Sequence, residues 1–255
     1  MAISLASLRT TATRQPPIVV LYGTSGIGKT TLATAAPTPV VVQTEEGLGT
    51  IDVPHFPLSK NWSDVMESLG ALYTEEHEFE TLVFDSVDHF EPMVWAETCR
   101  RNNWTSIEQP GYGKGYIAAA DVWREFLDGL IALRADKGMA VIVIAHHHTK
   151  RFDDPTSDPY DRYKIKLQDR AADLLIEKAD MVLFANWKLS TTKAAVGVNQ
   201  QVTRGVGRGE RMLYTEERPA FVAKNRYGLP PELPLRWDAL AAAMSGDVPQ
   251  EAKAA

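Results

Sequence analysis

The sequence predicts an α/β fold in which a mostly parallel central sheet is flanked by helices and followed by C-terminal β-hairpin segments. Through the first three quarters of its 255 residues, short apolar runs alternate with segments of helical spacing. Strands that alternate with helices in this way form parallel sheets covered by those helices. A glycine-rich turn joins the first apolar run to the first helix, and no internal repeat or linker breaks the pattern. We therefore expect one domain.

The predicted domain covers residues 17–245, between a flexible arm at residues 1–16 and a disordered tail at residues 246–255. Each predicted strand is a short continuous apolar run, as expected for a strand buried on both faces. These strands are residues 18–22, 40–42, 81–85, 139–145 and 181–187. The predicted helices are residues 29–36, 62–72, 88–100, 116–135 and 168–179. Loops are expected at residues 101–115 and 146–165, and hairpin-like strands at residues 196–204 and 211–223.

The composition is ordinary for a globular protein, with 44% hydrophobic and 24% charged residues. No run approaches the ~20 apolar residues that a membrane-spanning helix needs, and the first residues lack the apolar run of a secretory signal. We therefore expect a cytoplasmic location. The single cysteine, Cys99, excludes an internal disulfide framework. The net charge of −6 means that contact with nucleic acid would depend on local basic patches.

The segment Gly23–Thr30 matches the P-loop pattern G-x-x-x-x-G-K-[ST] at every fixed position. Its glycines let backbone N–H groups surround phosphates, and the following helix directs its N-terminal dipole at them. In this pattern Lys29 reaches the β- and γ-phosphates, and the Thr30 hydroxyl ligates Mg²⁺. The sequence therefore predicts binding of ATP with Mg²⁺, contacted by Gly23, Thr24, Ser25, Gly26, Ile27, Gly28, Lys29, Thr30 and Thr31.

The apolar strand at residues 81–85 ends in Asp85, which is the Walker B arrangement. A carboxylate at the carboxyl end of such a strand reaches the Mg²⁺ shell, so we expect Asp85 to be a Mg²⁺ ligand. The alternative is that it only caps the next helix. Ser86 follows, where many ATPases have the glutamate that activates water. A general base must then come from elsewhere.

Glu45 and Glu46 follow the apolar strand at residues 40–42 and are the candidates for that base. We expect this strand to lie adjacent to the P-loop strand, which would deliver the two carboxylates beside the γ-phosphate. The alternative is a solvated acidic turn.

These segments resemble the RecA family of ATPases. Gln43-Thr44-Glu45-Glu46 and Phe84-Asp85-Ser86-Val87 match the family's strand-end acidic segment and its Walker B segment, and the strand at residues 141–145 ends at His146. The resemblance implies that Glu45 is the catalytic glutamate. It also implies that His146 occupies the γ-phosphate sensor position, where the family usually has Gln.

Near the C-terminus, Ala223-Lys224-Asn225-Arg226 resembles the Lys-Asn-Lys segment of the same family. The resemblance implies that Lys224 and Arg226 reach across a subunit interface into the ATP site of a neighbour. There they would join Lys29 in stabilising charge on the transferring phosphoryl group. The implied assembly is a homo-oligomer with ATP at its subunit interfaces.

A compact RecA-like ATPase domain without further domains resembles the ATP-binding proteins of tailed bacteriophages that are associated with single-strand annealing and recombination. The segments at residues 111–116 and 223–230 fit that group. The resemblance implies DNA-stimulated ATP hydrolysis in the cytoplasm of a bacterial host. The implied partners are single-stranded DNA and a single-strand DNA-binding or annealing protein, with no membrane.

Two loops, at residues 101–116 and 147–166, are candidates for DNA contact because they combine basic with aromatic side chains. The first offers Arg101, Trp104, Tyr112, Lys114 and Tyr116. The second offers Lys150, Arg151, Phe152, Tyr160, Arg162, Tyr163, Lys164 and Lys166. A further candidate is the turn with Arg204, Arg208 and Arg211. The alternative for each is a solvated surface segment.

Two other functions stay open: a slow ATP-dependent regulatory switch without DNA binding, and a small-molecule kinase with residues 147–166 as its lid. A GTPase is disfavoured because the sequence has no N-K-x-D segment. An AAA+ machine is disfavoured because the C-terminal part has the pattern of strands and prolines and not of a helical lid. The run His146-His147-His148 is not expected to bind a metal, because successive side chains on a strand point to opposite faces.

Overall fold

The computed structural model describes residues 15–155, 158–195 and 201–246, and between residues 189 and 208 it describes the backbone alone. The predicted arm at residues 1–16 and tail at residues 246–255 therefore lie almost wholly outside the described residues.

The described strands and helices follow the alternation that the sequence predicts. The strands are β1 (Ile18–Gly23), β2 (Pro39–Gln43), β3 (Thr81–Asp85), β4 (Ala140–Phe152), β5 (Tyr160–Ile165), β6 (Met181–Ala195), β7 (Gln201–Tyr214), β8 (Lys224–Asn225) and β9 (Glu232–Pro234). The helices are α1 (Lys29–Ala33), α2 (Trp62–Thr74), α3 (Val87–Asn102), α4 (Lys114–Lys137), α5 (Asp169–Lys178) and α6 (Trp237–Ser245).

The strands form one sheet in the order β2-β3-β4-β1-β6-β7-β9, with β5 paired to β4 and β8 paired to β6. The pairings among β2, β3, β4, β1 and β6 are all parallel. Those made by β5, β7, β8 and β9 are antiparallel. The prediction of a mostly parallel sheet with C-terminal hairpin segments is confirmed.

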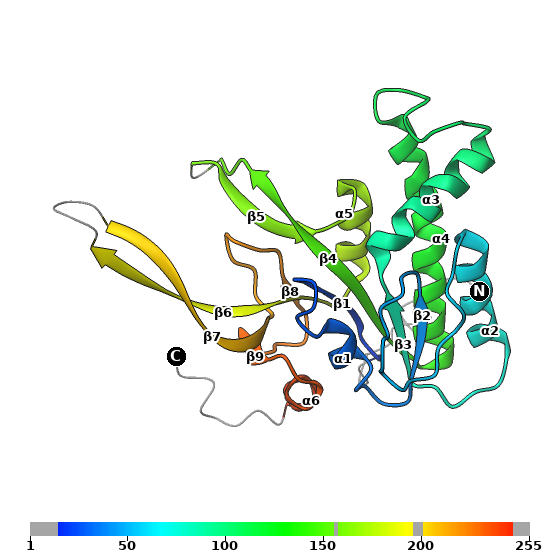
Figure 1. Cartoon of the computed structure of the whole chain (residues 1–255). Helices are drawn as coiled ribbons and strands as arrows, with labels where there is room; N and C mark the ends of the chain where they lie inside the picture. Colours follow the sequence, from blue (N-terminus) through cyan, green and yellow to red (C-terminus); the bar gives the residue numbers. More distant parts are fainter. Residues whose placement is uncertain (1–14, 156–157, 196–200, 247–255) are drawn as a thin grey trace, which may run out of the picture.

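Helices cover both faces of the sheet, and the two long hairpins project from one side of it (Figure 1). Along β1, Val20 and Tyr22 pack into the core under α2, α3, α4 and α5, whereas Val19 and Leu21 pack into the core with α1 and α6. Successive residues of a strand point to opposite faces, so a strand covered on both faces has to be apolar throughout. Among the described residues, no helix is both long and apolar enough to cross a membrane.

Residues 146–165 do not form the loop that the sequence predicts. β4 continues to Phe152 and pairs with β5 as an antiparallel hairpin (Figure 1). Phe152 faces Tyr160 across this hairpin, with ring centroids 5.6 Å apart, and His147 contacts the diagonally placed Tyr163, with ring centroids 5.0 Å apart. The prediction was wrong because charged residues between these aromatic rings interrupt the apolar run and conceal the strand.

The later hairpin also differs from its prediction. β6 continues past the apolar run at residues 181–187 to Ala195, and it pairs with β7, which ends at Tyr214. The predicted strand at residues 211–223 is therefore too long at its C-terminal end. Pro219 lies in that stretch and lacks the N–H group that a continued ladder needs. Residues 196–200 of the other predicted strand lie outside the described residues.

Candidate nucleotide-binding site

The turn between β1 and α1 is shaped by two glycines. A Cβ atom on Gly23 would lie 2.0 Å from the carbonyl oxygen of Ala185 in β6, so only glycine allows the two backbones to approach this closely. Gly28 precedes α1 with φ of +107°, in the left-handed region that favours glycine. These positions let the chain turn sharply from strand to helix, as the P-loop pattern requires.

Lys29 is held inside the turn. Its side chain is 6% exposed, and its Nζ donates hydrogen bonds to the carbonyl oxygens of Gly23 at 3.3 Å and Thr24 at 3.0 Å. Burial lowers the pKa of Lys29, while the charges of the nearby carboxylates oppose that shift. The ammonium group is thus positioned by the backbone of the P-loop itself, and phosphate oxygens would complete its hydrogen bonding.

Thr30 and Asp85 meet at the base of the site, as the sequence predicts for two Mg²⁺ ligands. The Thr30 hydroxyl donates a hydrogen bond of 2.7 Å to Asp85 Oδ2. Asp85 is 5% exposed, and burial raises its pKa, although the Thr30 hydrogen bond and the Lys29 charge oppose the rise. A hydroxyl beside a carboxylate is the hard oxygen donor set that suits Mg²⁺, so these two residues fit the ion that accompanies ATP.

A cavity of about 360 Å³ lies over the P-loop. It is lined by Ser25, Gly26, Gly28, Lys29, Thr30, Thr31, Glu45, Glu46, Gly47, Ile51, Asp85 and His146. Most of the predicted nucleotide contacts therefore face one cavity, together with two of the candidate catalytic residues from other elements, Glu45 and His146. The side chain of Ile27, one of the predicted nucleotide contacts, does not face the cavity, because it is 0% exposed and packs in the core. Thr24 Oγ1 instead donates to Asn186 Oδ1 at 3.3 Å.

Glu45 reaches this cavity by a different route from the one expected. β2 is not adjacent to the P-loop strand β1, since β3 and β4 lie between them. Glu45 still lines the cavity because the carboxyl ends of parallel strands share one edge of the sheet. Its Oε2 lies 3.0 Å from His89 Nδ1 on α3, and that nitrogen also lies 2.9 Å from Ser86 Oγ.

His146 is oriented by Asp88, a residue that sequence reasoning missed. Asp88 Oδ1 accepts a hydrogen bond of 3.0 Å from the His146 backbone N–H, and Oδ2 lies 3.0 Å from His146 Nδ1. Burial of Asp88 favours its neutral form, but the hydrogen bonds and charge of His146 outweigh that effect and lower the pKa to about 2. The spacing of Asp88 and His89 after Asp85 places both on the first turn of α3, and no motif of the sequence indicated their roles.

Lys224 and Arg226 do not lie at this chain's own nucleotide cavity. β8 pairs with β6 at Met181 and Val182, at the amino end of that strand and away from the P-loop. Lys224 Nζ donates to the carbonyl oxygens of Ile176 at 2.7 Å and Glu177 at 3.0 Å in the last turn of α5. The Arg226 side chain is 57% exposed, 3.7 Å from Asp180.

Several basic residues of the two candidate DNA loops are already paired with acidic groups. Arg101 donates to Glu97 at 2.7 Å and also to Glu125. Lys150 is paired with Asp169, and the buried Arg162 is paired with Glu217. By contrast, Tyr112 is 100% exposed at the tip of the first loop, beside the exposed Lys114.

Arg211 lies behind the P-loop and not on the turn with which the sequence grouped it. Its Nη1 donates a hydrogen bond of 3.2 Å to the Ile27 carbonyl oxygen, and a Cβ atom on Gly28 would lie 2.8 Å from that nitrogen. The residue therefore braces the phosphate turn from β7. The side chains of Arg204 and Arg208 lie outside the described part of the chain.

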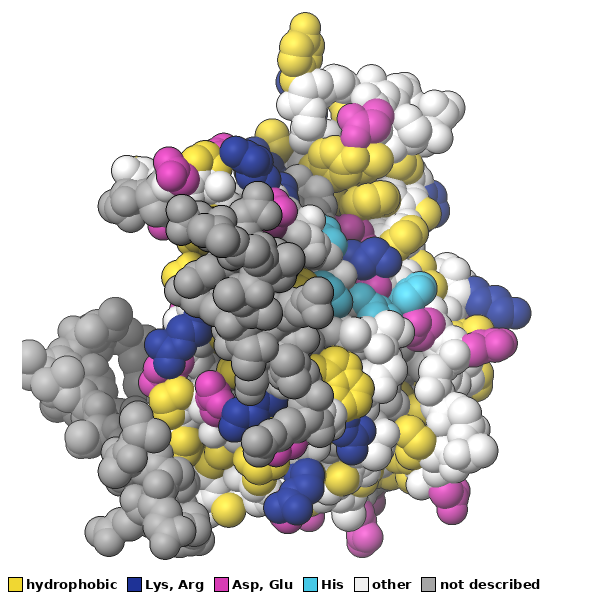
Figure 2. Space-filling view, turned by 60° about the vertical axis from the view of Figure 1, so that its left-hand side comes forward, with side chains coloured by type: hydrophobic (Ala, Val, Ile, Leu, Met, Phe, Trp, Pro, Cys, Tyr) yellow, Lys and Arg dark blue, Asp and Glu magenta, His cyan; other side chains and the backbone are white. Residues whose placement is uncertain are grey.

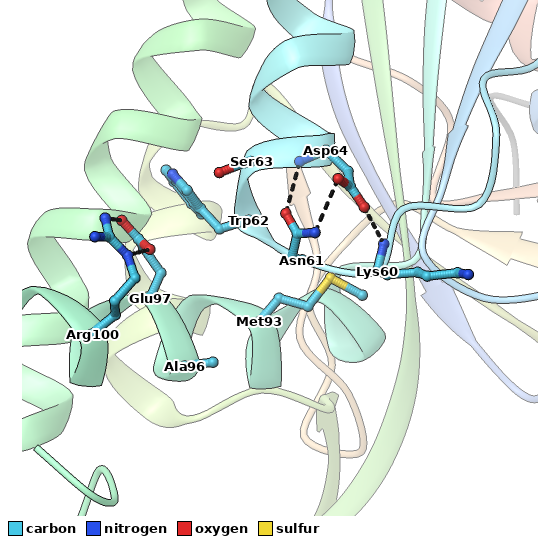
Figure 3. A pocket seen from close by; sticks show the side chains of 9 residues that line it. All are labelled: Lys60, Asn61, Trp62, Ser63, Asp64, Met93, Ala96, Glu97 and Arg100. Carbon is cyan, nitrogen blue, oxygen red and sulfur yellow. Dashed lines mark hydrogen bonds and ion pairs between the residues drawn. The ribbon is translucent and has the colours of Figure 1, made fainter.

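A second cavity, of about 400 Å³, lies where α2 begins beside α3 (Figure 3). It is lined by Lys60, Asn61, Trp62, Ser63, Asp64, Met93, Ala96, Glu97 and Arg100. Its polar groups largely bond to one another: Asp64 Oδ2 accepts from the Lys60 N–H at 2.8 Å, and Arg100 donates to Glu97 at 2.7 Å. This cavity shares no residue with the P-loop cavity.

A family model described as an AAA domain matches residues 15–227 of the chain. The chain belongs to the AAA domain family. Together with the P-loop, the buried Asp85 and the mostly parallel sheet, this membership identifies a RecA-like P-loop ATPase core. The sequence had disfavoured an AAA+ machine because of its C-terminal strands. β8 and β9 lie in that region, and because the family match gives only the class of the domain, the prediction against an AAA+ machine stays a prediction.

One curated relative is the SPbeta prophage-derived uncharacterized protein YorG of Bacillus subtilis (strain 168), which is 25% identical over 174 residues. The match covers 66% of this chain, and the chain spans 50% of the length of that relative. Among solved structures, the RadB recombinase is similar with a TM-score of 0.44 and 17% identity, over 82% of this chain and 86% of that one. The relative agrees with the phage association that the sequence implied.

Proposed function

We propose that the protein binds ATP with Mg²⁺ and hydrolyses it to ADP and phosphate, and that it acts on single-stranded DNA in phage-like recombination or annealing. The observation that carries the nucleotide part is the 2.7 Å hydrogen bond between Thr30 and Asp85 at the base of a cavity that Lys29, Glu45 and His146 also line. A Mg²⁺ ligand pair, a phosphate-binding cation and a carboxylate base are what hydrolysis of a γ-phosphate needs.

The chain's own groups have distinct parts in this reaction. The P-loop backbone and Lys29 bind the phosphates, and Mg²⁺ at Thr30 and Asp85 would neutralise charge on the phosphate oxygens. The Glu45 carboxylate accepts a proton from the attacking water, whose oxygen bonds to the γ-phosphorus as the bond to the ADP oxygen breaks. His146, held by Asp88 at 3.0 Å, donates toward the γ-phosphate oxygens and senses their presence.

The same proposal places Lys224 and Arg226 in the ATP site of a neighbouring subunit. Their position at the amino end of β6 keeps them from this chain's own nucleotide. Arg226 is the more available of the two because its side chain is 57% exposed, whereas Lys224 is held by the last carbonyls of α5. In a homo-oligomer, Lys224 would have to exchange those carbonyls for phosphate oxygens.

The DNA part is supported by the first candidate loop and by the β4–β5 hairpin. Tyr112 and Lys114 offer an exposed ring beside an exposed cation, which suits base stacking with phosphate neutralisation. The hairpin returns to the nucleotide cavity, because the Lys166 N–H donates a hydrogen bond of 2.9 Å to the His146 carbonyl oxygen. Binding of single-stranded DNA to the hairpin would therefore shift the position of His146, the proposed γ-phosphate sensor.

The test is the rate of ATP hydrolysis with and without single-stranded DNA, at about 50 and about 200 mM salt. We expect strong stimulation that falls as salt rises, no activity in Lys29→Ala, and loss of stimulation in Tyr112→Ala with the basal rate kept. Glu46→Gln serves as the control for Glu45→Gln and should retain hydrolysis. Hydrolysis that is indifferent to DNA at both salt concentrations would refute the DNA part alone.

A slow regulatory switch without DNA binding is the second candidate, and one contact favours it. Glu45 Oε2 lies 3.0 Å from His89 Nδ1, so the proposed base is already engaged by a neighbour. If that contact persists with ATP bound, hydrolysis would be slow. A basal rate that rises in His89→Ala, with no response to DNA in either protein, would support the switch.

A further inference from the structure

Glu45, His89 and His146 form a cluster beside the nucleotide cavity. They come from three separate elements: the segment after β2, the first turn of α3, and β4. One potential ligand atom of each lies within 4.8 Å of those of the other two. We infer that this cluster is a binding site for a divalent transition-metal ion of the zinc type, distinct from the Mg²⁺ that accompanies ATP.

The spacing of the cluster is close to that of a zinc site. Ligand atoms that lie about 2.0–2.2 Å from a tetrahedral zinc ion are roughly 3.4 Å apart. His89 Nδ1 and Glu45 Oε2 are 3.0 Å apart, so these two need almost no movement to share an ion. The potential ligand atom of His146 lies within 4.8 Å of those of Glu45 and His89 and needs a small movement toward them to complete the set. Three protein ligands would leave a fourth position for water, as in zinc sites that stay open.

The surroundings of His146 are those of a metal-binding histidine. Asp88 Oδ2 lies 3.0 Å from His146 Nδ1, and Asp88 Oδ1 fixes the backbone N–H of the same residue at 3.0 Å. A histidine ligand usually donates its second ring nitrogen to a carboxylate, which fixes the tautomer and raises the basicity of the ligand. Asp88 is thus the expected outer partner, and its side chain is 2% exposed.

The donor set separates this ion from Mg²⁺. Imidazole nitrogens suit zinc and similar metals, whereas Mg²⁺ prefers oxygen ligands such as Thr30 and Asp85. The nearby charges include Asp85 and Asp88 as anions and Lys29 and Lys166 as cations, with Lys166 Nζ 3.8 Å from Asp88. Figure 2 shows histidine side chains gathered on one face, beside acidic and basic ones.

The run His146-His147-His148 contributes a single histidine to this cluster. His147 packs on the other face of β4 against Tyr163 and Phe184, with ring centroids 5.0 and 6.3 Å away. His148 does not belong to the cluster, so the run supplies His146 alone. The partners come from α3 and from the end of β2. Because the proposed function uses Glu45 as the base and His146 as the γ-phosphate sensor, a bound ion would withdraw both from hydrolysis, and that consequence alone rests on the proposed function.

The test is titration of Zn²⁺, and of Co²⁺ followed by visible absorption, into untagged, nucleotide-free protein in a buffer with excess Mg²⁺. We expect one equivalent of metal to bind. Affinity should fall at least 10-fold in His89→Ala and His146→Ala, and about 10- to 100-fold in Asp88→Asn, which is the usual cost of losing an outer partner. His55→Ala, which removes an exposed histidine that is not part of the cluster, is the matched control and should bind as the native protein does.

Circular dichroism of each variant shows whether it is folded. If a variant of a metal ligand does not fold, Asp88→Asn, which changes no ligand, replaces it in the comparison. Absence of stoichiometric Zn²⁺ binding in the native protein would overturn the inference. Equal affinity in the native protein, His89→Ala and Asp88→Asn would overturn it as well, since the ion would then bind elsewhere. Because no nucleotide is present, failure here leaves the proposed ATPase activity untouched, and failure of hydrolysis leaves the metal site untouched.

Discussion

Replacing Glu91 with glutamine should stabilise the protein above neutral pH. Glu91 lies on α3, is 7% exposed, and accepts hydrogen bonds of 3.0 and 3.2 Å from the Gln168 N–H at the start of α5. Burial raises the pKa of its carboxyl group from 4.5 to about 7, with the Gln168 hydrogen bond opposing the rise and the Asp88 charge adding to it. The fold therefore holds a carboxyl group where its charged form is disfavoured.

The sign of the pH dependence follows from the raised pKa. The folded protein binds the proton of the Glu91 carboxyl group more tightly than the unfolded chain does. The contribution of this proton to the free energy of unfolding is therefore complete below pH 4.5 and is lost as pH rises through 7. A rise of the pKa from 4.5 to about 7 corresponds to at most about 3.4 kcal/mol. Glu91→Gln keeps an oxygen to accept the Gln168 N–H and removes the charge. It should therefore gain about 2–3 kcal/mol at pH 8 and close to nothing at pH 4.

The assay is urea unfolding followed by circular dichroism at pH 4, 6, 7 and 8, for the native protein and for Glu91→Gln. Glu67→Gln on α2, where the side chain is exposed, is the control for loss of a glutamate charge and should leave the unfolding free energy within about 0.5 kcal/mol. If Glu91→Gln unfolds at lower urea than the native protein at pH 8, the carboxylate is a stabilising anion at the start of α5, and the reasoning from burial is wrong.

Three further perturbations test the site and its framework. Glu45→Gln should keep ATP binding and slow hydrolysis at least ~100-fold, the scale of general-base loss, and unchanged turnover would assign the base to another residue. Mixing Lys224→Ala subunits with Lys29→Ala subunits should partly restore hydrolysis by pairing intact half-sites, and no rescue at any ratio would count against an interface site. Gly23→Ala should cost roughly 3 kcal/mol or more in urea unfolding, because its Cβ would meet the backbone of β6 at 2.0 Å. Gly70→Ala on α2, where a Cβ meets nothing within 4 Å, should be neutral or stabilising, and equal losses would remove the steric explanation.

The parts of the site that could be predicted depend on local chain geometry. The P-loop contains its own strand-to-helix turn, so the residue pattern from Gly23 to Thr30 is enough to place backbone N–H groups, Lys29 and Thr30 together. Asp85 could be predicted because it ends a buried strand, and the carboxyl end of each parallel strand faces the same edge of the sheet. Glu45 reached the site for that same reason, although the expected adjacency of its strand to β1 was wrong.

The parts that could not be predicted depend on which elements pack together. Asp88 and His89 have the form of ordinary residues in the first turn of a helix. They meet His146 and Glu45 only because β4 lies between β1 and β3 and brings its end beside α3. Arg211 belongs by sequence to a basic turn, yet the pairing of β7 with β6 places it against the Ile27 carbonyl oxygen.

The sequence by itself determined the α/β class and the P-loop turn, because apolar runs and glycine positions act through contacts between near neighbours in the chain. The tertiary structure alone decided that the second candidate DNA loop is a hairpin, that Lys224 and Arg226 lie at the far end of β6, and that a histidine-carboxylate cluster stands beside the nucleotide cavity. Each of these depends on strand order and register, which are set by the packing of apolar side chains from distant segments and leave no local pattern in the sequence.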